Sequence, residues 1–95
     1  MKYNIEDFLS ASPNRDESVA DFDARVMSAV VKLSACAAKE PQSHYPFAAA
    51  VVRDADRVIV GQGLNSSQLK NDPTLHGEVV AIRDACANLG EDTSV

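Results

Sequence analysis

The segment 45–65, YPFAAAVVRDADRVIVGQGLN, constrains the fold more than any other part of this chain. Two short runs rich in alanine, valine and isoleucine flank the turn sequence DAD at positions 54–56, which indicates a β-hairpin. The apolar residues are continuous rather than alternating, a pattern typical of strands covered on both faces in an α/β sheet. Gly61 and Gly63 permit a bulge or the close approach of another backbone. We therefore predict a hairpin within an α/β domain.

A segment with helical periodicity precedes the hairpin. Ser18, followed three residues later by Asp21, fits a helix start, and Pro41 marks the end. We predict a helix over about residues 18–39. Its apolar stripe recurs at spacings of three and four residues and comprises Phe22, Val26, Ala29, Val30, Leu33, Cys36 and Ala37.

Residues 1–17 are polar and irregular, with SASPNRDES as a turn-rich linker. Within them Ile5, Phe8 and Leu9 have the spacing of one helical turn that packs on the body. We divide the chain into this N-terminal segment and one domain over residues 18–95, since 95 residues suit a single small core.

A second helix follows the hairpin. Asp72 is a suitable N-cap, Pro73 a suitable first helical residue and Gly90 a suitable C-cap. The expected order is helix, strand, strand, helix. The face of this second helix that we expect to be buried comprises Val79, Ile82, Cys86 and Leu89, with Val80 beside it.

Charge and composition narrow the classes of partner. The net charge is −5 and the basic residues are scattered singly, which disfavours nucleic acid as a partner and favours a small neutral ligand. No apolar run has the length of a membrane span, and MKYNIEDFLS lacks the basic start and apolar stretch of a signal peptide. We therefore expect no membrane association and a cytoplasmic protein.

Two cysteines, Cys36 and Cys86, are too few for a disulfide framework and form no CxxC pair. Both lie among alanines and aliphatic residues at helical spacing. We expect each to be a small buried apolar side chain.

The chemistry of the sequence is concentrated at the start of the second helix, in DPTLHGEVVAIRDAC. Residues i and i+2 of a helix point about 200° apart, yet near a helix N-terminus His76 and Glu78 can converge. His76 would then ligate zinc while Glu78 moves protons to and from the metal-bound water. The alternative interpretation is that His76 is simply a histidine in a capping region and Glu78 a solvated glutamate.

The stretches PFAAAVV, GQGLN and NDPTLHGEVVAIRDAC resemble the N-terminal half of the zinc-dependent cytidine/deoxycytidylate deaminase superfamily, in its guanine and nucleoside deaminase branch. The resemblance implies part of a three-layer α/β/α fold without the later strands. It also implies that His76 is a zinc ligand and Glu78 the general acid/base. By the same likeness Asn65 would hydrogen-bond the substrate, a nucleobase or nucleoside, and Phe47 would shape the base pocket.

Three departures from the family pattern bear on this expectation. Gly77 stands where alanine is usual, Ala48 stands where a glycine is usual, and the PCxxC motif that supplies two thiolate ligands is absent. Cys86 lies about 15 Å beyond His76 along a helix, too far for a shared zinc ion. A site shared with His44, the other imidazole, stays an open alternative. Zinc belongs to the complete family site, and we do not expect this chain alone to bind it stably.

Two functions remain open from the sequence. The first is the N-terminal portion of a zinc-dependent hydrolytic deaminase acting on guanine, cytidine or adenosine, inactive alone. The second is a non-catalytic α/β association module, or a subunit that needs a partner chain. In either case FAAAVV would be left as an unpaired apolar strand edge, so we expect a homo-oligomer or a complementing C-terminal segment as partner.

Overall fold

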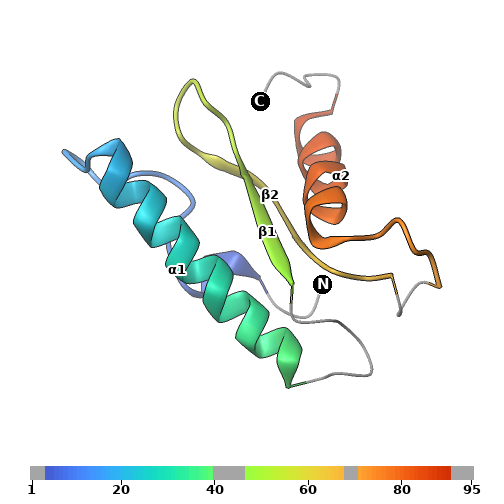
Figure 1. The fold of residues 1–95 in the computed structure, drawn as a ribbon. Coiled ribbons are helices and arrows are strands. Elements are labelled where there is room, and N and C mark those ends of the chain that lie inside the picture. Colours follow the sequence, from blue (N-terminus) through green and yellow to red (C-terminus); the bar gives the residue numbers. More distant parts are fainter. Residues whose placement is uncertain (1–3, 40–46, 68–70, 91–95) are drawn as a thin grey trace.

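A computed structural model describes residues 4–39, 47–67 and 71–90. The elements occur in the predicted order, with a 3₁₀ turn added at the start: η1 (Ile5–Asp7), α1 (Val19–Ala38), β1 (Ala48–Val52), β2 (Ile59–Leu64) and α2 (Gly77–Leu89). Figure 1 shows the two strands between α1 and α2. Neither helix in these ranges combines the length and apolar character needed to cross a membrane.

Helix α1 agrees closely with the predicted segment. The Ser18 hydroxyl accepts a hydrogen bond from the Asp21 N–H at 3.1 Å, so Ser18 is the N-cap. The C-cap is Lys39, and Pro41, the predicted stop, lies outside the described residues. Most of the predicted stripe is buried, namely Phe22, Val26, Ala29, Leu33 and Ala37.

The hairpin has antiparallel strands with a register in which Ala48 faces Leu64. The register shifts between Val51 and Val52, which marks a β-bulge. The connection is wider than the DAD turn alone, because the Arg53 N–H donates to the Val58 carbonyl and Arg57 adopts a left-handed φ of 61°.

Alternation along β2 directs its side chains to the two helices. A Cβ built on Gly61 would lie 2.4 Å from the Ala81 carbonyl oxygen, and one built on Gly63 would lie 2.5 Å from the Ala81 nitrogen. Both glycines therefore face α2. Leu64 points the other way, into a cluster with α1 residues. The sheet is therefore covered on both faces, as its continuous apolar sequence predicts.

The core beneath α1 also holds the N-terminal turn. Ile5 of η1 is only 1 % exposed and packs with Leu33 and Leu64, while Phe8 and Leu9 lie against this cluster. The Ile5 N–H donates to the Gln62 side-chain oxygen. The predicted helical turn is thus present, and it is tied to β2.

Helix α2 begins later than predicted. Its N-cap is His76 and its first residue Gly77, so Asp72 and Pro73 are not the helix start. The Asp72 carboxylate instead accepts hydrogen bonds from the Thr74 hydroxyl at 2.7 Å and the Thr74 N–H at 2.9 Å. These bonds, with the hydroxyl the larger cause, lower the pKa of Asp72. An aspartate that caps a helix can equally close a local turn, and the turn forms here.

The buried face of α2 also differs from the predicted one. The buried residues are Gly77, Ala81 and Ala85, whereas Ile82 is 54 % exposed and Cys86 is exposed. The predicted burial of Cys86 is therefore wrong, and Cys36 on α1 is only half-buried. The reason is that α2 lies directly on two glycines of β2, where only small side chains fit.

Candidate functional site

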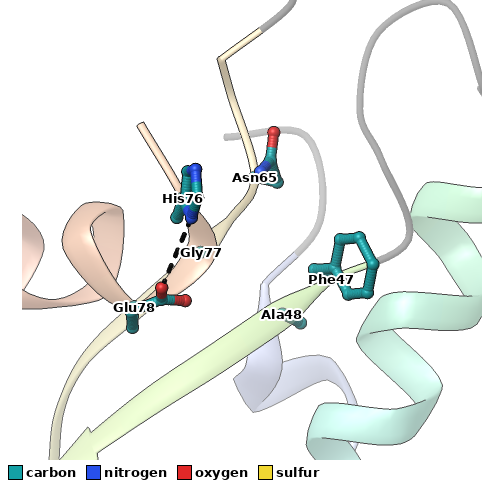
Figure 2. A pocket seen from close by; sticks show the side chains of 6 residues that line it. All are labelled: Phe47, Ala48, Asn65, His76, Gly77 and Glu78. Atoms are coloured by element: carbon teal, nitrogen blue, oxygen red, sulfur yellow. Dashed lines mark ion pairs between the residues drawn. The ribbon is translucent and has the colours of Figure 1, made fainter. Parts of the chain in front are cut away.

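A pocket of about 330 Å³ lies where the N-terminus of α2 meets the start of β1 and the end of β2. This volume is at the lower end for small-molecule sites. Figure 2 shows the side chains that line it. All of them belong to the segments singled out in the sequence: Phe47, Ala48, Asn65, His76, Gly77 and Glu78.

His76 and Glu78 converge because His76 is outside the helix proper. As N-cap it has extended backbone angles, φ −70° and ψ 158°, so the angular separation of i and i+2 within a helix does not apply. Its Nδ1 lies 3.6 Å from Oε1 of Glu78, the contact drawn dashed in Figure 2. The His76 side chain makes no capping hydrogen bond. Both side chains are more than half exposed and accessible to a ligand.

Asn65 is held at the rim by its neighbours along the chain. It follows β2 directly, is 7 % exposed, and its N–H donates to the Phe47 carbonyl at 3.0 Å. Its side-chain oxygen accepts hydrogen bonds from the Ser67 N–H at 3.1 Å and the Ser67 hydroxyl at 2.8 Å. A backbone N–H can only donate, so these bonds fix the orientation of the amide group.

Ser67 was not among the predicted site residues, although it orients one of them. The sequence carries a signal for it, because an Asn-Ser-Ser run after a strand favours side-chain bonds to the backbone two residues on. A neighbouring bond, from the Ser66 N–H to the Leu75 carbonyl at 2.8 Å, ties the end of β2 to the residue before His76. The loop and the helix start are thereby held together.

Phe47 and Ala48 form the opposite wall. Phe47 is 63 % exposed. A Cβ on Gly77 would lie 3.2 Å from the Phe47 carbonyl oxygen and 3.5 Å from the Ala48 Cα. Gly77 therefore lies against the backbone of Phe47 and Ala48, where a methyl group at position 77 would fit only tightly.

The donors at the pocket fall short of a complete metal centre. Within the described ranges no group of three or more His, Cys, Asp or Glu side chains could hold a metal ion. A catalytic zinc site uses three protein ligands and a water molecule, and His76 supplies one suitable nitrogen. His44, the alternative second imidazole, lies outside the described residues. The residues described therefore do not by themselves fit a catalytic zinc ion.

The sequence matches one known protein family and several members of known function. The family described as "Cytidine and deoxycytidylate deaminase zinc-binding region" matches residues 20–95. The chain is 49 % identical over 45 residues to the guanine deaminase of Bacillus subtilis, covering 47 % of this chain and 28 % of that protein. It is 36 % identical over 70 residues to the tRNA-specific adenosine deaminase of Haemophilus influenzae, covering 74 % of this chain and 39 % of that protein.

A solved structure agrees with the sequence relatives. The X-ray structure of guanine deaminase from Bacillus subtilis superposes with a TM-score of 0.59 and 35 % identity, over 78 % of this chain and 43 % of that chain. The chain thus spans less than half the length of each of these relatives.

Proposed function

This chain belongs to the cytidine and deoxycytidylate deaminase zinc-binding family, and on that premise we propose that its pocket is one half of a zinc-dependent hydrolytic deaminase site. The substrate class is a nucleobase or nucleoside of the guanine, cytidine or adenosine type. The observation that carries the proposal is the shared pocket, in which a histidine, a glutamate, an asparagine and an aromatic residue from three segments meet. A cytoplasmic location remains part of the proposal.

Each pocket residue has a proposed role. In the completed site His76 would be one zinc ligand, and Glu78 would stay off the metal and serve as the general acid/base. In zinc deaminases the metal activates the attacking water molecule. Asn65, whose side-chain oxygen accepts hydrogen bonds from Ser67, hydrogen-bonds the substrate. Phe47 provides an apolar face on which the base stacks.

Catalysis by the 95 residues alone is not part of the proposal. Among the described residues, the one imidazole at the pocket leaves two protein ligands to be supplied. Neither cysteine lies there, because Cys36 is on α1 and Cys86 is on the third turn of α2. A complementing segment that brings two thiolates would complete the site. The acidic net charge of −5 favours a small substrate over tRNA.

A chimera tests the assignment. Residues 1–90 would be fused to the part of the Bacillus subtilis guanine deaminase beyond the superposed region. We expect one zinc ion per chain and release of ammonia from guanine. The Glu78→Gln substitution should lower the rate of ammonia release at least about 100-fold while zinc is retained, because a general acid/base contributes this much to the rate. His76→Ala should remove zinc as well.

Cys86→Ser is the matched control for the chimera, since Cys86 is exposed on α2 away from the pocket and should affect neither zinc nor rate. Circular dichroism of each variant checks that it folds. A folded, zinc-loaded chimera whose rate is insensitive to Glu78→Gln would refute the role of Glu78. Zinc retained at full occupancy in the His76→Ala variant would refute the role of His76 as a zinc ligand.

The second candidate function is a non-catalytic association module. The observation that favours it is the incomplete donor set within the described residues. This alternative predicts that the chimera, although folded, gains neither zinc nor activity.

A further inference from the structure

The N-terminal segment packs into the fold although it precedes the residues matched to the family, which begin at residue 20. Ile5 of η1 is among the largest fully buried side chains of the described ranges. It packs with Leu33 of α1 and Leu64 of β2. A 3₁₀ turn of three residues is too short to be stable by itself, so this segment holds its conformation through the surface that receives it.

Gln62 is the polar residue of that receiving surface. It lies on β2 two residues before Leu64, and side chains two apart in a strand share a face, so Gln62 is on the face that packs against α1. Its half-buried side-chain oxygen accepts a hydrogen bond from the Ile5 N–H. Without a donor, a side-chain carbonyl on a covered apolar face destabilises the fold. Gln62 therefore favours a segment that carries a backbone N–H next to an aliphatic side chain.

The far end of the segment also bonds to β2. The Ala11 carbonyl accepts a hydrogen bond from the Ile59 N–H at 2.9 Å. Between the two bonds, Phe8 and Leu9 are half-buried against the same core cluster. Main-chain hydrogen bonds at both ends with apolar side chains between them are the means by which proteins bind extended peptides.

A separate contact ties the following residues to α1. Glu17 pairs with Arg25 through two hydrogen bonds of 2.8 Å, and Nη2 of Arg25 also donates to the Ser12 carbonyl at 3.4 Å. These bonds join the chain to α1 and are independent of β2. A segment that leaves β2 thus stays tethered beside its binding surface.

Release of the segment disrupts less of the core than unfolding of α1 does. The segment contributes one buried side chain from η1, that of Ile5, whereas α1 contributes five. Parts of a fold with few buried contacts open at a lower free energy than the core helices do. The contacts therefore allow the segment to open before the rest of the chain unfolds.

We propose that residues 4–12 are a latch, a peptide bound in cis to the surface formed by Leu33, Leu64 and Gln62. The latch opens and closes as one unit while α1, the hairpin and α2 stay folded. The chemistry that this surface recognises is a branched aliphatic side chain whose own N–H meets an amide oxygen, followed along the chain by a main-chain carbonyl. The proposal is independent of the pocket and of zinc.

Native-state hydrogen exchange followed by NMR tests whether the latch is one unit. In the parent chain we expect the Ile5 and Ile59 amides to exchange through a common opening, at least about tenfold faster than the most protected amides of α1. Gln62→Leu removes the acceptor of the Ile5 N–H. It should accelerate exchange at Ile59 as well, although the acceptor of that amide, Ala11, is unaltered.

Asn88→Leu is the matched control, because it removes another side-chain bond to β2, the one that Asn88 donates from α2 to the Val60 carbonyl at 2.8 Å. It should accelerate exchange at neither Ile5 nor Ile59. Exchange at Ile59 that Gln62→Leu leaves unchanged, or that Asn88→Leu accelerates equally, refutes the single unit. Exchange of both amides as slow as in the core of α1 refutes the early opening.

A peptide tests the recognised chemistry. In Ile5→Asp a carboxylate replaces the buried side chain, so the latch should stay open while circular dichroism still shows both helices. Calorimetry should then show one acetylated peptide of residues 4–12 bound per chain. The same peptide with Ile5→Asp should bind at least about tenfold more weakly. The parent chain, whose own latch occupies the surface, should also bind the unaltered peptide weakly.

Each other outcome contradicts the latch. An Ile5→Asp chain without helical signal shows that opening is unfolding of the whole fold. A folded Ile5→Asp chain that binds neither peptide, or both equally, shows that the surface does not recognise Ile5. A parent chain that binds the peptide as tightly as Ile5→Asp does shows that the peptide binds elsewhere.

Discussion

Glu17 and Arg25 form a two-point ion pair just before and within α1. The Arg25 Nε and Nη2 atoms each lie 2.8 Å from a carboxylate oxygen of Glu17, and the Asn14 N–H donates to the same group at 2.9 Å. These bonds, with the Arg25 contact the larger cause, lower the pKa of Glu17 from 4.5 to about 2. The pair fixes the N-terminal segment against the first turns of α1.

The lowered pKa predicts a pH dependence of stability. A carboxylate whose pKa is depressed by folding stabilises the fold fully above its unfolded pKa of 4.5, and this contribution is lost as the pH falls towards about 2. The difference in free energy of unfolding between the parent and Glu17→Gln should therefore shrink over this window. Urea denaturation at about pH 6 and about pH 2 measures it. A difference that is equal at both ends contradicts the assignment.

At the scale of single residues, the sequence predicted which side chains would gather and missed how they are held. His76, Glu78, Asn65 and Phe47 do line one pocket. The convergence of the first two depends on His76 being the N-cap, which sequence patterns assigned to Asp72. Local capping rules cannot separate the two, because an aspartate forms similar bonds in a turn and at a helix start.

At the scale of elements, the contact between β2 and α2 sets the position of the site. Gly61 and Gly63 let the helix lie against the strand backbone, and this contact places the helix N-terminus beside β1. The glycines were predicted to allow such an approach. The face of α2 was predicted wrongly, since hydrophobic periodicity ranks Ile82 above Ala81, whereas close packing on glycine selects the smaller residue.

Gly63→Ala tests the importance of this contact. The new Cβ would lie 2.5 Å from both the Ala81 nitrogen and the Gly77 carbonyl oxygen, which are helix backbone atoms and cannot rotate away. We expect a loss of about 1–3 kcal/mol in the free energy of unfolding, the usual cost of overpacking. Chemical denaturation checks the value.

Gly77→Ala provides the comparison for this prediction, since its nearest contact, 3.2 Å, needs only a small adjustment. It should cost less than Gly63→Ala. If Gly63→Ala is as stable as the parent, or if the order of the two variants is reversed, the packing argument is wrong.

At the scale of the whole molecule, element order and the α/β class followed from the sequence, because two helical stripes flank a continuous apolar hairpin. The family followed from the resemblance carried by PFAAAVV, GQGLN and NDPTLHGEVVAIRDAC. The side-chain bonds from α2 to β2 did not follow. Asp84 and Asn88 reach β2 across the fold, and no periodicity along the chain encodes such a contact. The division of the chain at residues 17 and 18 stays a prediction.

We propose that this chain carries half of a zinc site, and the zinc content of the purified 95 residues is the most direct test. Native mass spectrometry at equimolar zinc would compare the parent with His76→Ala and, as a control, Cys86→Ser. We expect zinc to be bound weakly and well below one ion per chain in all three proteins. One tightly held zinc ion per parent chain, lost in His76→Ala and kept in Cys86→Ser, would contradict it.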